Sequence, residues 1–402
     1  MRSKWSIRAY LLVLFAMVIS FFTNDFGLVD IQKTALVIAI GVDREEEDFI
    51  VTTQIALPKP EESGEQSAEI VSKGKTVSDA LEKINAKTGW YPKLVFCQLI
   101  VFGETAVSRN IFEGLNYFLR SEYISDDCLL ATCKGSAQEL LNEKNSVETL
   151  SGLAISKTLS ARAEEVGTVL PTTLREFSQN YYTASKSGYM PILKTENTQE
   201  KPLQKSNDNS SENQKSQGQV RGEEGSQGKS GGQDKVFSAG ETALFKGGVM
   251  VETFTREETL TLAFIKSKLR LASYSVATEG EDYLFSVRRN SVKNELSIKD
   301  KEQPKLEISV QVTAGLSDDN RPDTLKELIK SPQIPALPLS VAEKKLKAEI
   351  EGIFEKSRAV DCDIFECVET LRRKEYKYYE QKRNTLLQEI KPEIKVEFKT
   401  VR

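Results

Sequence analysis

A long polar segment at residues 195–236 is the feature that most limits how this 402-residue chain can fold. Among its Ser, Gln, Asn, Gly, Glu and Lys residues stand only three large apolar side chains, Leu203, Val220 and Val236. Such a composition buries too little apolar surface to offset the entropy that the backbone loses on ordering. We therefore expect a disordered linker or a long surface loop, which divides the folded body into regions at 28–194 and 237–402.

The N-terminus carries the pattern of an export signal. Arg2, Lys4 and Arg8 precede an apolar run at residues 9–22, and a basic stretch before a short apolar stretch is typical of such signals. The run is shorter than the ~20 residues that comfortably span a bilayer. Residues 1–23 are therefore predicted to be a signal peptide or an uncleaved membrane anchor. Because positive charge stays on the cytoplasmic side, the rest of the chain is expected on the extracytoplasmic side.

Composition argues against several classes of function. The chain has no His, the commonest general base and metal ligand. Its net charge of −4 is spread along the sequence, whereas a nucleic-acid partner would require a basic face or arm. The five Cys residues form neither a disulfide framework nor the usual spacing of a zinc site, so we expect free, buried thiols. They are Cys97, Cys128, Cys133, Cys362 and Cys367.

Hydrophobic periodicity predicts an α+β fold with mixed or antiparallel sheets covered by helices. Before the polar segment we expect a hairpin of strands at 34–43 and 49–57, strands at 94–102 and 128–133, and helices at 76–87, 106–120, 137–141, 147–165 and 172–185. After it we expect strands at 242–245, 249–254, 283–287, 294–298 and 305–313, an amphipathic helix at 340–358, helices within 363–389 and a last strand at 393–401.

Three kinds of short motif resemble ligand sites, but the surrounding sequence argues against each. Gly74-Lys75-Thr76 and Gly228-Lys229-Ser230 lack the first Gly of a phosphate-binding loop. Tyr182 and Lys186 have the spacing of a dehydrogenase pair, without the Gly-rich turn that would hold a dinucleotide. The acidic string from Asp318 to Asp323 lacks the Gly and the Glu that a calcium loop needs.

Two further groups of charged residues have simple structural interpretations. The pairs Asp126/Asp127 and Asp361/Asp363 have the chemistry of an acid and a base, but carboxylates at the ends of elements are more often caps or solvated charges. Four basic residues on the outer side of the helix at 340–358 predict a solvated face, with contact to a membrane surface or a partner as the alternative. They are Lys344, Lys345, Lys347 and Arg358. We therefore predict no catalytic, cofactor-binding or metal-binding residues.

Five strings stand in a fixed order along the chain. Residues 30–43 end in Gly-Val-Asp, residues 72–80 begin Ser-Lys-Gly-Lys-Thr, and residues 101–106 read Val-Phe-Gly-Glu-Thr-Ala. Beyond the polar segment, residues 240–259 hold Gly-Glu-Thr-Ala-Leu-Phe-Lys and a later Glu-Glu-Thr, and Asp-Ile-Phe at 363–365 precedes a basic helix and the last strand. In this order the strings resemble the GerAC-type, or Ger(x)C, family of spore germination proteins.

The resemblance implies an exported, membrane-tethered α+β protein without enzymatic activity or cofactor. It would be the C subunit of a nutrient germinant receptor, beside integral-membrane A- and B-type subunits at the spore inner membrane. The family usually follows its signal with a lipobox Cys, whereas the first Cys here is Cys97. We therefore expect residues 9–22 or the partner subunits, not a lipid, to hold the protein. Such tethering raises the effective concentration, so that a modest interface suffices for docking.

The residues alone leave two other functions open. An extracytoplasmic domain that binds a small molecule predicts a deep apolar pocket with a few convergent polar groups. A carboxylate-dependent cell-wall hydrolase predicts two carboxyl groups facing each other across a cleft, ~5–9 Å apart.

Overall fold

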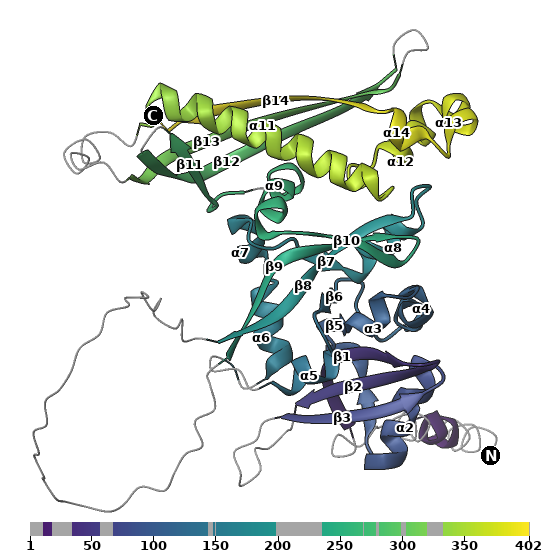
Figure 1. The fold of residues 1–402 in the computed structure, drawn as a ribbon. Coiled ribbons are helices and arrows are strands. Elements are labelled where there is room, and N and C mark those ends of the chain that lie inside the picture. The colour runs from purple at the N-terminus through teal and green to yellow at the C-terminus, as the bar shows by residue number, and fades with distance from the viewer. Residues whose placement is uncertain are drawn as a thin grey trace, which may run out of the picture.

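The computed structural model describes residues 11–17, 34–56, 67–143, 148, 150–197, 235–267, 269–278, 281–298, 303–319 and 333–401. These residues form the predicted α+β fold, with one ten-stranded and one four-stranded sheet. Figure 1 shows the four-stranded sheet at one end of an elongated body, with the larger sheet running away from it. Of the predicted signal or anchor, the structure describes only a helix at 11–17. In the described part of the chain, no helix is long and apolar enough to cross a membrane.

The large sheet has the strand order β10-β9-β8-β6-β5-β1-β2-β3, and β4 and β7 pair with β1 and β6. Its members are β1 (Thr34–Glu45), β2 (Asp48–Ala56), β3 (Ser67–Gly74), β4 (Tyr91–Lys93), β5 (Leu99–Phe102), β6 (Leu129–Cys133), β7 (Thr172–Thr173), β8 (Ser187–Asn197), β9 (Lys235–Lys246) and β10 (Val249–Phe254). The strands β1, β5, β6 and β8 run parallel, and the meanders at both ends are antiparallel. The predicted hairpin of the first two strands is confirmed.

Side chains of a strand alternate between the two faces of a sheet. In the large sheet, helices cover both faces, so both sets of side chains are buried. In β5, Ile100 and Phe102 enter one apolar cluster, whereas Leu99 and Val101 enter another. The first cluster takes in α2 (Val77–Thr88), α4 (Phe112–Arg120) and α8 (Leu174–Tyr181), and the second takes in α5 (Ala137–Asn142) and α6 (Ser151–Thr158). Such cover on both faces is what a sheet with central parallel strands requires.

The small sheet has the order β11-β12-β13-β14. Its strands are β11 (Ser273–Thr278), β12 (Glu281–Ser297), β13 (Lys305–Asp319) and β14 (Lys391–Thr400). The helix α11 (Ala336–Ala359) lies along it (Figure 1) and buries the predicted stripe of Ala342, Leu346, Ile350, Ile353 and Phe354. Four more helices complete this half, namely α9 (Arg256–Lys266), α12 (Cys367–Lys374), α13 (Tyr376–Lys382) and α14 (Leu386–Glu389).

The polar segment connects two neighbouring strands of one sheet. β8 and β9 pair antiparallel, and Asn197 lies opposite Lys235. Residues 195–197 and 235–236, which we expected in the linker, are therefore strand residues. Residues 198–234, where disorder is predicted, lie outside the described residues. The division into regions at 28–194 and 237–402 stays a prediction, and the large sheet contains strands from both.

Two of the predicted helices are divided in the structure. The expected helix at 106–120 is α3 (Glu104–Val107) followed by α4. The backbone N–H of Ile111 donates to the carbonyl of Gly248 at 2.8 Å, so the β9–β10 turn holds the break. The helix expected at 147–165 is likewise divided into α6 and α7 (Ala161–Val166).

Several strands also differ from the prediction. The strand expected at 94–102 begins as a 3₁₀ turn, η2 (Leu94–Phe96), because β4 and β5 both pair with β1 and the turn joins them. The two strands expected at 283–287 and 294–298 are one continuous strand, β12. The strands β3, β4, β7, β8 and β11 and the helix α9 were not predicted.

Candidate functional site

The first string of the resemblance ends in a buried carboxylate that caps a helix. Asp43, at 6% exposure, accepts hydrogen bonds from Ser136 Oγ at 2.9 Å and from the backbone N–H groups of Ala137 and Gln138 at 2.9 and 3.0 Å. These donors form the N-terminus of α5, which Ser136 also caps. A helix N-terminus leaves backbone donors unpaired and favours negative charge. Asp43 therefore joins β1 to α5.

Glycines from the same strings leave the space that Asp43 and the start of α5 occupy. A Cβ on Gly103 would lie 1.8 Å from Asp43 Oδ1, and a Cβ on Gly41 would lie 3.1 Å from the Ala137 Cβ. Next to Gly103, the Glu104 carboxylate accepts from the Gly135 N–H at 3.1 Å, beside the start of α5. The strings at 30–43 and 101–106 thus meet in one place. Sequence reasoning missed this role of Asp43, whose partners are about 94 residues away.

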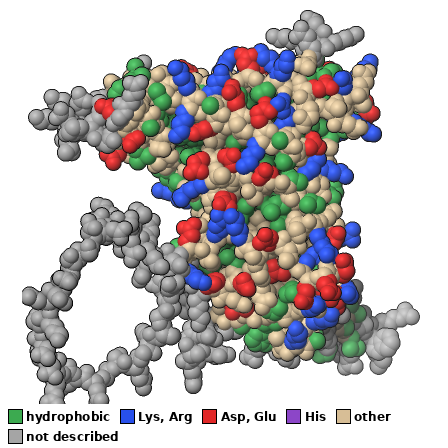
Figure 2. Space-filling model, viewed as in Figure 1, with side chains coloured by type: hydrophobic (Ala, Val, Ile, Leu, Met, Phe, Trp, Pro, Cys, Tyr) green, Lys and Arg blue, Asp and Glu red, His purple; other side chains and the backbone are tan. Residues whose placement is uncertain are grey.

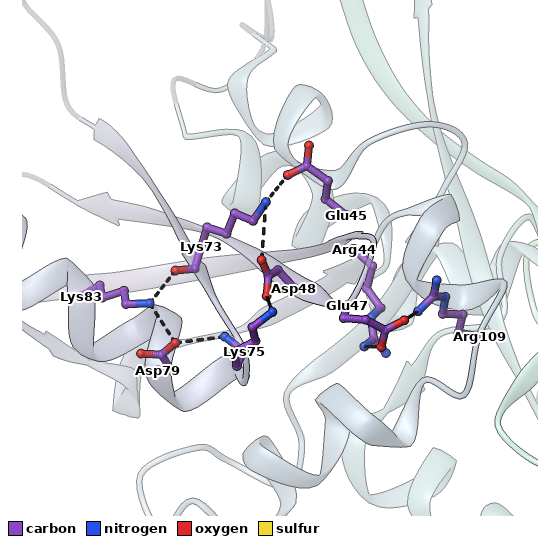
Figure 3. Close-up of polar contacts among 9 residues, drawn as sticks. All are labelled: Arg44, Glu45, Glu47, Asp48, Lys73, Lys75, Asp79, Lys83 and Arg109. Atoms are coloured by element: carbon purple, nitrogen blue, oxygen red, sulfur yellow. Dashed lines mark hydrogen bonds and ion pairs between the residues drawn. The ribbon is translucent and has the colours of Figure 1, made fainter.

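A network of ion pairs covers the surface beside the β1–β2 turn (Figure 3). Lys75 Nζ lies 2.7 Å from Asp48 Oδ1, and Lys73 Nζ lies 3.5 Å from Asp48 and 2.5 Å from Glu45. The hydrogen bond from Lys75 lowers the pKa of Asp48. Thr76 caps α2 by accepting from the N–H of Asp79 at 3.1 Å. The Gly-Lys-Thr string is therefore a helix start whose Lys is paired with a carboxylate.

Arg44 lies at the inner border of this network. Its side chain is 7% exposed, forms an ion pair with Glu113 and lies 4.3 Å from the centre of the Phe49 ring. Farther out, Arg109 pairs with Glu47 at 3.0 Å. Charges of both signs alternate here, and Figure 2 shows them interspersed over the described surface of this face.

Residues from both sides of the polar segment form a junction between the two sheets. Lys356 of α11 donates to both Glu258 oxygens, at 3.1 and 2.8 Å, and to the Thr253 carbonyl at 2.8 Å. Glu258 also forms a capping box with Thr255 at the start of α9. The Glu-Glu-Thr string therefore fixes α9 between β10 and α11.

The Asp-Ile-Phe string strengthens the same junction. The buried Asp363 carboxylate accepts from the N–H groups of Cys367 and Val368 at 2.9 and 2.8 Å and so caps α12. Its own N–H donates to Ser187 Oγ of β8 at 2.9 Å. Burial raises the pKa of Asp363. Nearby, Asp361 forms an ion pair with Lys246 at 2.7 Å.

Glu369 in α12 provides a third contact of the junction. It accepts from Arg372 Nη2 at 2.8 Å, from Arg373 Nε at 2.9 Å and from the N–H of Ala184 at 3.3 Å. The hydrogen bond from Arg372 is the largest influence on this carboxyl and lowers its pKa to about 2. Glu369 thus stays ionised under almost all conditions and links α12 to the turn that precedes β8.

The remaining motif residues are engaged in contacts or lie on the surface. Asp126 and Asp127 both pair with Arg175, at 3.4 and 3.5 Å. Tyr182 is 70% exposed, and Lys186 occupies a turn with φ of 48°. Residues 228–230 and 320–323 lie outside the described residues.

Three of the four predicted basic residues of α11 contact their neighbours, and Lys344 is exposed. Lys345 donates to the Ser275 carbonyl at 2.8 Å, and Lys347 lies 3.9 Å from Glu351. Arg358 pairs with Glu355. All five cysteines are free and buried, as predicted.

Three open hollows are candidates for small ligands. One of about 610 Å³ lies between α9 and β12 and is lined by Lys266, Arg270, Arg288 and Arg289 among others. One of about 550 Å³ lies between the start of α2 and the end of α4, beside Tyr117 and Tyr123. A third, of about 310 Å³, lies along β9.

Comparison with known proteins decides the family. The family model described as the spore germination protein N-terminal domain matches residues 28–195, and the model described as spore germination B3/GerAC-like, C-terminal, matches residues 240–402. The chain belongs to the GerAC-like family of spore germination proteins. The predicted resemblance is thereby confirmed. Its motif residues Asp43 and Gly103 contribute to the Asp43 junction, and Glu258 and Asp363 contribute to the contacts between the sheets.

A solved structure described as the GerBC protein is similar to this GerAC-like chain. It is 15% identical, with a TM-score of 0.49, and the match covers 90% of this chain and 97% of that one. A comparison with curated proteins gave no match.

Proposed function

We propose that this GerAC-like protein is the C subunit of a spore nutrient germinant receptor and that it acts by docking on integral-membrane A- and B-type subunits. The observation that carries the proposal is the pair of family matches, which follow each other in order over residues 28–195 and 240–402. The apolar run at 9–22 is a suitable tether on the extracytoplasmic side of the spore inner membrane.

The contacts of the motif residues favour a non-enzymatic role. Asp43 and Asp363 accept hydrogen bonds from helix N-termini, and Glu258 is held by Lys356 and by its own helix. Carboxylates held in this way stabilise packing and are not free to transfer protons to a ligand. The acidic pairs considered for a hydrolase are also paired with basic residues or bound to a helix end.

The proposal is tested by purification of the complex from spores. The chain carries a C-terminal affinity tag at its own locus, and the inner membranes of dormant spores are solubilised in a mild detergent. We expect the A- and B-type subunits to elute with the tagged chain. The matched control is the same strain without the gene for the B-type subunit, in which the yield of the complex should fall. Elution of the chain alone, from membranes that contain the other subunits, would contradict the proposal.

A further inference from the structure

An exposed apolar patch lies beside the point where the N-terminal segment enters the fold. Tyr91, Val95 and Phe96 are 57%, 58% and 51% exposed. Outside the helix at 11–17, the other exposed large apolar side chains of the described chain stand far apart in sequence, at Tyr123, Tyr182, Val251, Leu271, Leu337 and Tyr376. Single exposed apolar residues are ordinary, whereas a group of them marks an interaction site.

The register of the large sheet fixes where this patch lies. β4 pairs in parallel with the first residues of β1, and Tyr91 lies opposite Thr34. η2 follows β4 directly, and its Leu94 is buried whereas Val95 and Phe96 face outward. Neighbouring strands lie about 4.8 Å apart. The patch is therefore next to the residue at which the chain arrives from the N-terminal run.

The same N-terminal run needs an apolar environment that the folded body does not supply. In the helix at 11–17, the side chains of Leu11, Leu12, Val13, Leu14, Phe15 and Met17 are all 60–68% exposed. Eleven residues stand between Phe22 and Thr34, so twelve steps along the chain join them, and a fully extended chain covers at most ~3.3–3.6 Å per step. The start of β1 is thus held within about 40 Å of any bilayer that receives the run.

When a body is held at a single point, that point of attachment stays nearest the membrane. The residues at that point have the composition of a membrane interface, since Trp90, Tyr91 and Lys93 closely precede the exposed Val95 and Phe96 in the sequence. Trp and Tyr concentrate at the level of the lipid headgroups, and Lys extends its charge to water from there.

We propose that Tyr91, Val95 and Phe96 insert into the lipid interface and orient the protein with the β4–η2 end toward the membrane. The occupant of the patch is thus the bilayer surface and not a partner subunit. The inference rests on the membrane tethering contained in the proposed function. It adds a second, non-covalent contact, which stops free rotation and gives the rest of the body a constant orientation toward its partners.

The tryptophans of the chain allow a direct test. The sequence contains only Trp5 and Trp90, so Trp5→Phe leaves a single reporter beside the patch, and Trp90→Phe leaves one at the N-terminal run. The full chain is reconstituted into vesicles of phosphatidylcholine and phosphatidylglycerol, with or without bromine on the acyl chains near the headgroup. Bromine quenches tryptophan emission on contact. We expect at least a twofold loss of Trp90 emission in the brominated vesicles.

Two controls make the test specific. In the Trp5→Phe/Trp90→Phe/Tyr182→Trp variant, the reporter occupies an exposed position just before β8, which lies three strands away from β1 in the sheet, and less than a tenth of its emission should be lost. In the Trp5→Phe chain, Val95→Glu together with Phe96→Glu should return Trp90 quenching to that level. Both side chains are exposed, so the fold should tolerate the changes, and circular dichroism checks this.

The outcomes separate the patch from the tether. Trp90 emission that bromine leaves unchanged overturns the inference, as does quenching that survives the two Glu substitutions. If Trp5 in the Trp90→Phe chain is quenched while Trp90 is not, the tether stands and only the patch fails. If neither is quenched, the membrane part of the proposed function fails with it. A change in Trp90 emission that occurs only when A- and B-type subunits are added would assign the patch to a protein partner and would also overturn the inference.

Discussion

The Asp43 carboxylate lies against the Cα of Gly103 with no room for a further carbon atom between them. It stabilises α5 through two backbone donors and one hydroxyl. Replacing an N-cap side chain by Ala typically costs about 1 kcal/mol. The Gly and Asp residues of this motif thus support packing at the start of α5.

The first prediction compares two glycines. Gly103→Ala should lower the free energy of unfolding by about 2–3 kcal/mol, because its Cβ collides with Asp43. Gly352→Ala, on the exposed side of α11 where a Cβ meets nothing within 4 Å, should raise it by about 0.5–1 kcal/mol. Urea denaturation measures both. In an Asp43→Ala background the penalty of Gly103→Ala should shrink, and an unchanged penalty would show that the collision is not its cause.

The second prediction concerns pH. The pKa of Glu369 is about 2 in the folded chain against an ordinary value of 4.5. A lowered folded pKa contributes stability above the unfolded value, and this stability is lost as the pH falls from 4.5 toward 2. Glu369→Gln should therefore destabilise the protein at pH 7 by about 1–2 kcal/mol, a range reduced for the solvent exposure of the two arginines. The difference from wild type should narrow below pH 4.5 in pH-dependent urea denaturation. A constant difference would exclude ionisation as its origin.

At the scale of elements, the sequence predicted those helices and strands that depend on interactions between neighbouring residues. The stripe of α11 and the β1–β2 hairpin both follow from neighbouring residues. The capping box of Thr255 and Glu258 was also a readable signal for α9, and we missed it. The break before α4 could not be predicted, because the carbonyl that holds it belongs to Gly248. The Asp43 junction was hidden for the same reason, since its donors lie on another element.

The third prediction concerns the insertion between β8 and β9. Because Asn197 and Lys235 are paired, replacing residues 200–232 by a short Gly-Ser turn should leave both sheets intact. Closing a shorter loop costs less entropy, so the free energy of unfolding should rise by about 1–2 kcal/mol. Thermal and urea denaturation measure the change. A large loss of stability, or a loss of the β8–β9 amide protection in hydrogen exchange, would show that the segment has a structural role.

At the scale of the whole molecule, the junction of Lys356, Asp363 and Glu369 joins the two sheets. The resemblance predicted the family and the order of its two regions. It did not predict that β9 and β10, which follow the polar segment, complete the first sheet. Apolar periodicity identifies strands but not the strands with which they pair. Here β8 and β9 pair although the whole polar segment separates them in the sequence.

The fourth prediction concerns how the protein is retained. We expect it in the membrane fraction of spores, resistant to a high-salt wash and released by detergent. N-terminal analysis then separates two mechanisms. An intact Met1 or Arg2 would show that residues 9–22 are the anchor, and cleavage near residues 18–20 would show that partner subunits hold the protein. Release of the cleaved chain by salt alone would contradict membrane tethering.

The most direct test of the central claim is a germination assay. The gene is deleted in a strain that lacks its other nutrient receptors, and the fall in optical density of the spores is followed with a panel of nutrients. We predict that the response to at least one nutrient is lost, that the wild-type gene restores it, and that the exposed-site control Tyr182→Trp restores it equally. Wild-type germination of the deletion strain with every nutrient would contradict the assignment of this chain to a germinant receptor.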